Sequence, residues 1–276
     1  MSWEESVAWL RSQPDKQALV FACYFDDPIE SAADRFCRSE EFNEVLKLAS
    51  LSTNSKVLDL GSGRGISAYA FARHGHQVTA LEPDSSNLVG RGAIEQLSQV
   101  SGLPIRISQA SAEEIDSADD FFDLVYCRAA LHHARSLEDL CKEVYRVLKP
   151  GGMFIASREH VIGAESELAA FLASHPLHSL YGGEMAYTLK TYQKGIVGSG
   201  LGVKKVFGPR QSVINGFPKT TSEIDTEVID FLSRRLGLPG RLLGKTASVR
   251  KATTVWLDHR DRQPGRLYTF VAQKPR

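Results

Sequence analysis

Val57-Leu58-Asp59-Leu60-Gly61-Ser62-Gly63-Arg64-Gly65 is the stretch that decides the fold of this 276-residue chain. Its first half predicts a short buried strand over Lys56–Leu60, which runs directly into a glycine-rich turn. The residues that follow, Ile66–Arg73, place apolar side chains at helical spacing and leave a polar outer face. Glycines let a backbone approach a ligand closely, and a helix N-terminus presents unpaired N–H groups. Strand, turn and helix together therefore predict a site for a nucleotide-type ligand.

Two acidic residues indicate which ligand this site would take. Asp59 stands before the first glycine, where a carboxylate is of no use to a pyrophosphate but suits a ligand with an ammonium group. Glu82 ends the next expected strand, Gln77–Leu81, close to the spacing at which an acid meets ribose hydroxyls. One acid for an amine and one for a ribose favour S-adenosylmethionine (SAM) over NAD.

Further segments extend this pattern in a fixed order along the chain. Leu58–Gly65 contains an acid-x-Gly-x-Gly-x-Gly loop, Glu82 matches a ribose acid, and Ala112-Glu113 matches an adenine-side pair. Phe122–Cys127 is similar to a fourth strand, and Leu148–Gly152 to the turn before a fifth. Residues 40–160 thus resemble the class I SAM-dependent methyltransferase superfamily.

This resemblance implies a cofactor, a fold and a set of cofactor contacts. The cofactor is SAM. The fold is α/β, a Rossmann-like doubly wound sheet of seven mostly parallel strands with an antiparallel last strand. Ser111 stands where many relatives carry an acid near the adenine, so this contact departs from the family pattern. The expected cofactor-binding residues are Asp59, Gly61, Ser62, Gly63, Gly65, Glu82, Pro83, Ser111, Ala112, Glu113 and Arg128.

The chain divides into a helical leader and an α/β domain. Residues 1–52 predict helices, one of which begins with Ser39 as its N-cap and acids in its first turn. In relatives such helices lie over the ligand mouth; a collar that only adds stability is the alternative. Residues 53–276 alternate strands and helices, as in a parallel sheet covered on both faces. The expected strands are Lys56–Leu60, Gln77–Leu81, Ile105–Gln109, Leu124–Arg128, Met153–Ser157, Val203–Phe207 and Arg266–Gln273.

Residues 208–264 form an insertion between the last two expected strands. The segment is too long for a bare loop, so it should have structure of its own. Helical spacing begins near Thr220, and a basic run broken by glycines follows. We expect a cap that helps to enclose the substrate; a contact between two copies of the chain, as in a homodimer, is the alternative.

Composition narrows the class of partner. Lys plus Arg and Asp plus Glu both number 33, so the net charge of +0 does not favour nucleic acid or an anionic membrane. The acidic start Met1–Glu5 does not resemble a secretory signal, and no apolar run has the length of a membrane span. The four cysteines lack metal-ligand spacing. We expect a cytoplasmic protein with reduced thiols and no metal site.

Histidines stand where the chemistry is expected, because open sheets of this kind bind ligands beyond the carboxyl ends of their strands. His132 and His133 follow the fourth expected strand, and His160 follows the fifth. A histidine suits the role of general base near neutral pH, and His160 and His133 are the candidates, with His160 slightly preferred because the fifth strand leaves it beside Glu159 and near the 175–184 loop. Alternatively, the His132-His133 pair only frames the site. The expected substrate contacts are Tyr24, His132, Glu159, His178, Tyr181 and Glu184.

These observations predict a SAM-dependent methyltransferase that methylates an oxygen of a small hydroxylated molecule, such as a sugar or a secondary metabolite. The reaction is implied by the resemblance, and the acceptor by the neutral charge and the polar, aromatic stretch His175–Glu184. Transfer to nitrogen or carbon is one alternative. A scaffold subunit that binds SAM without activity is another, which the intact Asp59, glycines and Glu82 argue against.

Overall fold

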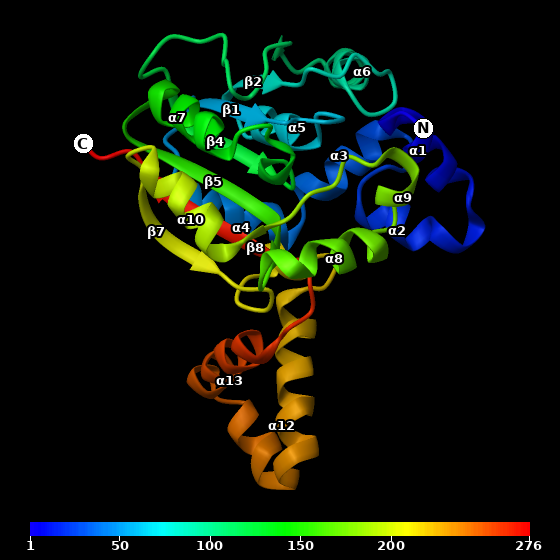
Figure 1. Cartoon of the computed structure of the whole chain (residues 1–276), viewed down its shortest axis with the longest axis vertical. Coiled ribbons are helices and arrows are strands. Elements are labelled where there is room, and N and C mark those ends of the chain that lie inside the picture. The colour runs from blue at the N-terminus through cyan, green and yellow to red at the C-terminus, as the bar shows by residue number, and fades with distance from the viewer.

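An eight-stranded sheet organises the computed structural model, which describes residues 1–276 (Figure 1). The strand order is β3-β2-β1-β4-β5-β8-β7, and the two-residue β6 pairs with β5. Strands β1 to β5 run parallel, whereas β8 is antiparallel to both β5 and β7. This confirms the predicted fold class. The strands are β1 (Lys56–Leu60), β2 (Gln77–Leu81), β3 (Ile105–Ser108), β4 (Phe122–Arg128), β5 (Leu148–Ile162), β6 (Tyr187–Thr188), β7 (Gly202–Phe207) and β8 (Arg266–Gln273).

Both faces of the sheet are buried, as the apolar strands require. Successive side chains of a strand point to opposite faces, so Val57 of β1 belongs to one core cluster and Leu58 to the other. On the first face the cluster includes residues of α3 (Ile29–Cys37), α4 (Glu40–Ala49), α5 (Ile66–Arg73) and α6 (Arg91–Ser101). On the second face it includes residues of α7 (Leu137–Val147) and α10 (Leu189–Gly198).

Helix α4 begins where its capping residue predicts. Ser39 accepts a hydrogen bond from the Phe42 N–H at the start of α4, which confirms it as the N-cap. Before α3 come α1 (Trp3–Ser12), a 3₁₀ turn at Pro14–Lys16 and α2 (Gln17–Ala22).

The first helix lies beside a segment that is far away in sequence. The ring of Trp3 in α1 lies 4.7 Å from that of Tyr181 in the single-turn α9 (His178–Tyr181). A 3₁₀ turn at Glu165–Glu167 and α8 (Leu168–Ser174) lead from β5 towards α9. The helical leader and the 175–184 stretch are therefore neighbours at one end of the sheet (Figure 1).

Strand β5 is longer than predicted and continues to Ile162. Its pairing with β8 is interrupted between Ala156 and Glu159, where Arg158 adopts a left-handed φ of 59°. The strand then resumes, and His160 pairs with Leu267. An antiparallel neighbour that continues alongside makes this extension favourable, since it satisfies the backbone groups. Glu159 and His160 thus lie within a strand and not after it.

The insertion of residues 208–264 is helical and consists of α11 (Val213–Gly216), α12 (Thr221–Gly244) and α13 (Ala247–Arg260). A capping box between Thr220 and Glu223 starts α12, and Gly237, with a φ of 64°, interrupts it. Figure 1 shows α12 and α13 as a hairpin that projects away from the body. No helix of the structure is both long and apolar enough to cross a membrane.

Candidate active site

The glycine loop is fixed between β1 and the two strands beside it. The N–H groups of Gly61 and Ser62 both donate to the carbonyl oxygen of Leu81 at the end of β2, at 3.0 and 3.1 Å. Gly61 has a φ of +68°, and a Cβ added to it would lie 2.6 Å from the Cβ of Ala130. A side chain at this position would therefore collide with the segment that follows β4, which explains the need for glycine.

Asp59 lies beneath the loop and not on its surface. Its side chain is buried and accepts a hydrogen bond of 2.5 Å from the Ser62 hydroxyl. Burial raises the pKa of this carboxyl to about 7, although the Ser62 hydrogen bond opposes the rise. In this structure Asp59 holds the loop in shape. Its contact with a ligand's ammonium group stays a prediction.

Glu82 stands beside the loop, where the ribose acid was predicted. Its carboxylate accepts hydrogen bonds from the backbone N–H groups of Gly63, at 2.7 Å, and Asp84, at 3.0 Å. Burial raises its pKa, while these two hydrogen bonds act in the opposite sense. Pro83 follows on the surface. The acid at the end of β2 and the backbone of the glycine loop thus lie next to each other.

The adenine-side residues lie in the connection from β3 to β4. Ser111 and Ala112 are half-buried there. The carboxylate of Glu113 accepts a hydrogen bond of 2.8 Å from the Arg135 N–H, which ties this connection to the start of α7. The predicted residues therefore share the carboxyl edge of the sheet with the glycine loop.

The side chain of Arg128 has a buried partner, and its predicted cofactor contact stays a prediction. Its guanidinium makes two hydrogen bonds to the carboxylate of Glu41 in α4, at 2.7 and 3.1 Å, and Glu41 is completely buried. The charge of Arg128 is thus engaged in a structural ion pair between α4 and the end of β4. The sequence pattern did not reveal this pair, because the partner lies far away in sequence.

Arg64 is a residue that the sequence analysis did not assign. Its buried guanidinium donates to the carbonyl oxygens of Tyr24 and Asp26, at 2.8 and 3.0 Å, and to the carboxylate of Asp27, at 2.5 Å. It fastens the α2–α3 connection to the glycine loop. The acidic pair Asp26-Asp27 was the sequence feature that could have indicated this role of Arg64, since a buried arginine needs such partners.

Tyr24 was predicted as a substrate contact, and the structure buries it. Its ring stacks on that of Phe217 at 5.2 Å, and its hydroxyl is buried without a hydrogen-bond partner. A contact between Tyr24 and a substrate would therefore have to use this hydroxyl.

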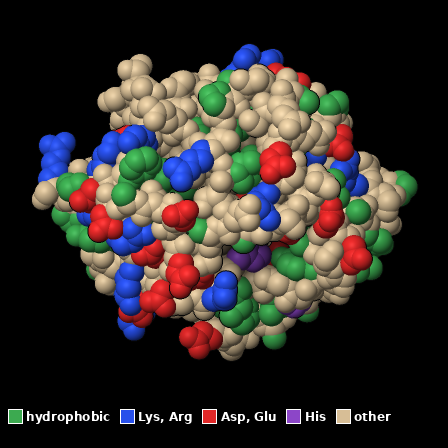
Figure 2. Space-filling view, turned by 90° about the horizontal axis from the view of Figure 1, so that it is seen from above, with side chains coloured by type: hydrophobic (Ala, Val, Ile, Leu, Met, Phe, Trp, Pro, Cys, Tyr) green, Lys and Arg blue, Asp and Glu red, His purple; other side chains and the backbone are tan.

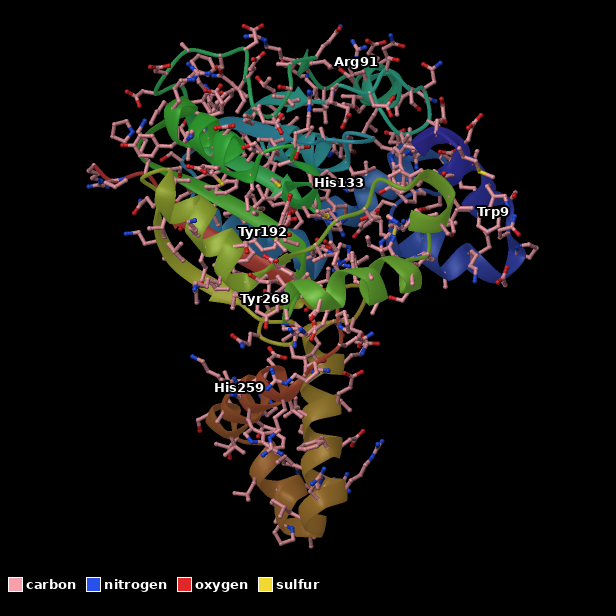
Figure 3. All side chains as sticks on the ribbon, viewed as in Figure 1. Trp9, Arg91, His133, Tyr192, His259 and Tyr268 are labelled. Atoms are coloured by element: carbon pink, nitrogen blue, oxygen red, sulfur yellow. The ribbon has the colours of Figure 1, made fainter.

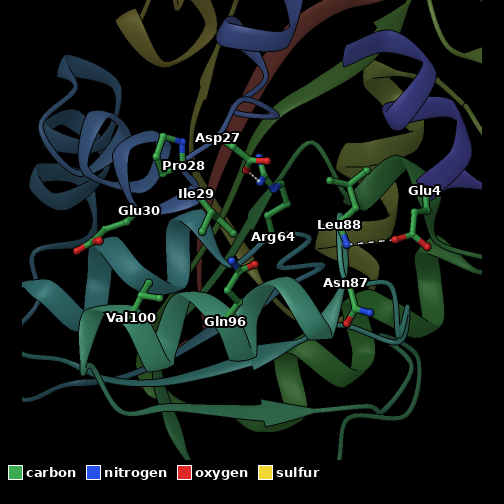
Figure 4. A pocket seen from close by; sticks show the side chains of 10 residues that line it. All are labelled: Glu4, Asp27, Pro28, Ile29, Glu30, Arg64, Asn87, Leu88, Gln96 and Val100. Atoms are coloured by element: carbon green, nitrogen blue, oxygen red, sulfur yellow. Dashed lines mark hydrogen bonds and ion pairs between the residues drawn. The ribbon is translucent and has the colours of Figure 1, made fainter. Parts of the chain in front are cut away.

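A surface groove near the loop is separate from the predicted cofactor site. Figure 4 shows this groove, which has a volume of about 520 Å³ and lies between α1, α3, α6 and Arg64. Its other lining residues are Glu4, Asp27, Pro28, Ile29, Glu30, Asn87, Leu88, Gln96 and Val100. None of the predicted cofactor-binding residues lines it.

Glu159, predicted as a substrate contact, lies at the centre of a buried hydrogen-bond network. It is fully buried and accepts hydrogen bonds from the N–H groups of Ala130, Leu131 and His132, at 3.1–3.2 Å. Its carboxylate also lies 2.7 Å from Nδ1 of His132, which must therefore carry the proton in this bond. Successive side chains of β5 point to opposite faces, so Glu159 points away from His160. Its hydrogen bonds instead fix the turn after β4 and orient His132.

Glu184 joins the predicted histidines on the other side. Its carboxylate lies 3.5 Å from Nε2 of His132 and 4.0 Å from Nε2 of His133, and it accepts a hydrogen bond from the Tyr181 hydroxyl. Burial disfavours the charged forms of both His132 and Glu184. Even so, Glu159 and Glu184 together raise the pKa of His132 to about 9, and the neighbouring His132 imidazole and the Tyr181 hydrogen bond lower that of Glu184 to about 2.

His160 completes this cluster from β5. Its ring lies 4.9 Å from that of His132 and 5.5 Å from that of His175, and its Nδ1 lies 3.0 Å from the carbonyl oxygen of Gly265. Burial and the charge of His132 lower the pKa of His160 to about 4. His178, predicted as a substrate contact, stands on α9 with a buried Nδ1 that has no partner.

The fold and this site define the class of protein. The strand order reverses between β1 and β4, and the glycine loop with its two acids stands at that point. Doubly wound sheets bind their ligands at such a switch point. With the antiparallel β8 inserted between β5 and β7, this is the fold of the class I SAM-dependent methyltransferases.

Comparison with known proteins agrees with this class. Residues 58–156 match a family model described as a methyltransferase domain. An uncharacterized methyltransferase, YcgJ, of Bacillus subtilis (strain 168) is 30% identical over 120 residues, which are 44% of this chain and 47% of that protein. A ubiquinone biosynthesis O-methyltransferase of Rhizobium rhizogenes (strain K84 / ATCC BAA-868) is 28% identical over 162 residues, 58% of this chain and 64% of that protein.

The likeness to solved structures extends over more of the chain. The crystal structure of a putative sarcosine dimethylglycine methyltransferase from Galdieria sulphuraria has a TM-score of 0.57 and 19% identity. It covers 90% of this chain and 87% of that one, and at this identity it shows the fold alone. The chain spans between about half and two thirds of the length of the two curated relatives.

Proposed function

We propose that this protein uses SAM to methylate an oxygen of a small hydroxylated molecule. The observation that carries the proposal is that the glycine loop and the histidine cluster meet at one edge of the sheet. Gly61 packs against Ala130, and the Ala130 N–H donates to Glu159, which orients His132. A cofactor held by the loop would therefore have its reactive end near the imidazoles.

The chemistry asks little of the protein beyond positioning and proton transfer. The acceptor oxygen bonds the methyl carbon, the carbon–sulfur bond breaks, and the hydroxyl proton must leave. Good alignment of the two reactants can offset about 7–11 kcal/mol of barrier, and a general base contributes about 10²–10⁴-fold. His133 and His160 both have a lowered pKa and are therefore neutral near pH 7, as a base must be.

Hydrogen bonds orient the two candidate bases in the same way. The Nδ1 atom of His133 faces the carbonyl oxygen of Gly183 at 3.1 Å, and that of His160 faces Gly265. Because a carbonyl only accepts, Nδ1 carries the proton in each ring and Nε2 keeps its lone pair. Both imidazoles therefore offer Nε2 as the proton acceptor.

The acceptor atom is the least constrained part of the proposal. The name of the Rhizobium relative supports oxygen, whereas the Galdieria neighbour is similar in fold alone and does not bear on the acceptor atom. Transfer to nitrogen needs less help from a base, so the cluster of imidazoles favours oxygen. A scaffold that binds SAM without turnover would have no use for two oriented imidazoles beside the loop.

Calorimetry on the purified protein tests the cofactor. SAM or S-adenosylhomocysteine should bind with a stoichiometry of one, and NAD should give no heat. Glu82→Ala should weaken SAM binding by at least about tenfold, since a charge-assisted hydrogen bond contributes about 1.5–3 kcal/mol. Glu95→Ala, at an exposed site on α6, is the matched control.

Transfer of a labelled methyl group from SAM to a panel of sugars, phenols and amines then tests the acceptor. A folded protein that binds neither sulfur ligand contradicts the whole proposal. SAM binding with label only on amines contradicts the oxygen assignment alone.

A further inference from the structure

Three side chains of the histidine cluster carry atoms that metals bind. His132 comes from the 3₁₀ turn Leu131–His133 after β4, His160 from β5, and Glu184 from the segment after α9. One nitrogen or oxygen of each lies within 4.8 Å of those of the other two. Because each residue comes from a different element, the arrangement follows from the fold and not from a local motif.

The two histidines are oriented as metal ligands usually are. Such a histidine donates its second ring N–H to a carboxylate or a backbone carbonyl, which fixes the ring and leaves the other nitrogen free. Nδ1 of His132 faces the buried carboxylate of Glu159 at 2.7 Å, and Nδ1 of His160 faces the Gly265 carbonyl at 3.0 Å. Both Nε2 atoms are thereby left for the centre of the cluster.

Glu184 supplies a second, independent observation. One oxygen of its carboxylate accepts the Tyr181 hydrogen bond, while the other, Oε2, is buried and makes no hydrogen bond, with Nε2 of His132 3.5 Å away. The side chain is only 5% exposed, so water cannot easily serve this oxygen. A buried carboxylate oxygen without a donor is costly, and a bound cation would satisfy it.

We propose that Nε2 of His132, Nε2 of His160 and the carboxylate of Glu184 form a site for one divalent transition metal, with Zn²⁺ the first candidate. Two histidines and one glutamate, with a further position open, are the ligand set of several catalytic zinc sites. Imidazole suits Zn²⁺ and its transition-metal neighbours, whereas Mg²⁺ prefers oxygen ligands and water. The sequence analysis expected no metal from the spacing of the cysteines, and these three residues form no local motif because they are widely separated along the chain.

The ion would serve the transfer reaction, and this step rests on the proposed function. A metal at the ends of β4 and β5 could hold the acceptor hydroxyl and promote loss of its proton before the methyl group arrives. The proton would pass to Nε2 of His133, which lies beside Glu184. His160 would then be a ligand, and His133 would remain the base.

The experiment uses full-length protein without a histidine tag, stripped with a chelator and then titrated with Zn²⁺ against a chromophoric competitor. We expect one tight site per chain. Co²⁺ added to the stripped wild type should give visible absorption bands of a low-symmetry site with nitrogen ligands, and excess Mg²⁺ should not displace it. This spectrum needs no variant, so it stays informative if a substitution impairs folding.

Substitutions then place the metal within the cluster. Glu184→Gln and His160→Gln should abolish the tight site, and Glu159→Gln, which removes only the partner of His132, should weaken it by about 10–100-fold. His259→Gln on the projecting hairpin (Figure 3) should leave it unchanged. SAM binding, measured in parallel, should survive all four substitutions.

Two results would overturn the metal site. One is a folded wild type with no stoichiometric Zn²⁺ binding. The other is binding that His259→Gln weakens as much as His160→Gln, which would indicate surface histidines. Loss of SAM binding in the wild type would instead contradict the proposed function and leave the metal site standing.

Discussion

His133 and His160 have the same orientation but very different surroundings. The side chain of His133 is 39% exposed, whereas His160 is enclosed by the rings of His132, Phe171 and His175. Figure 2, which views the body from the end opposite the hairpin, shows histidine surface recessed in the middle of that face. A base must reach the acceptor directly or through one water. The more accessible imidazole is therefore the better candidate, and we propose His133 for this role in place of the expected His160.

His133→Gln should lower the turnover number by about 10²–10⁴-fold and leave SAM affinity unchanged. Partial burial and the charge of His132 lower the pKa of His133 below its usual 6.5. The wild type should then lose activity as the pH falls below this value, because the protonated ring cannot accept a proton. The variant should lack this acid limb. The measurement is kcat and KM from pH 5 to 9, and wild-type rates for His133→Gln across that range would contradict the assignment.

A buried ion pair, in addition to apolar packing, connects helix α4 to strand β4. Glu41 in the first turn of α4 is fully buried, and its two oxygens accept from Nε and a terminal nitrogen of Arg128. Arg128→Met should lower the free energy of unfolding by about 3–5 kcal/mol, since it leaves a buried charge without its partner. The double variant with Glu41→Met should be closer to the wild type. Urea unfolding measures both.

The control for this pair is an exposed one of similar type. Lys47→Met breaks the contact to Glu44 on the same helix, where the lysine side chain is 74% exposed, and should change stability by less than about 1 kcal/mol. If Arg128→Met is no more destabilising than Lys47→Met, the buried pair does not hold α4 in place.

The elements that could be predicted from the sequence are those whose order is local. The bounds of β1, β2 and β8 agree with the prediction to the residue, because buried apolar runs flanked by turns define such strands. Strand β5 was predicted too short, since its second half depends on pairing with β8 across a bulge. A pattern read along one strand contains no information about its partner.

The residues of the site likewise divide into those set by local sequence and those set by partners distant in sequence. The glycine loop and Glu82 are a local motif and were placed correctly beside each other. The buried partners of Glu159 and Arg128 were not predicted, because these partners, His132 and Glu41 respectively, are distant in sequence. The clustering of the rim histidines around Glu184 likewise required the fold.

The insertion of residues 208–264 has two parts with different surroundings. Its first residues contact the body near the site: the carbonyl oxygens of Ile214 and Phe217 accept from Arg158, and Phe217 stacks on Tyr24. The hairpin of α12 and α13 instead projects from the body (Figure 1). Only the part that precedes α12 therefore stands where the predicted cap would act.

The projecting hairpin exposes apolar side chains at its tip and along α13. They are Leu236, Leu238, Leu242, Leu243, Val255 and Trp256, each at least 41% exposed. A set of large apolar groups on one projection is typical of an interaction surface. The alternative to a cap, a contact between two copies of the chain, thus gains support. Association through such a hairpin would bury these groups, which favours it by about 25 cal/mol per Å².

Deletion of residues 221–260, with a short Gly-Ser linker in their place, distinguishes the two roles of the insertion. SAM affinity should be nearly unchanged, because the glycine loop and Glu82 do not depend on the hairpin. If the hairpin joins two copies, light scattering should give a dimer mass for the full chain and a monomer mass for the deletion. Leu242→Lys with Leu243→Lys should act like the deletion, and Lys245→Ala should not. If the mass is the same in all variants and only turnover is lost, the hairpin acts as a cap and the contact between copies is wrong.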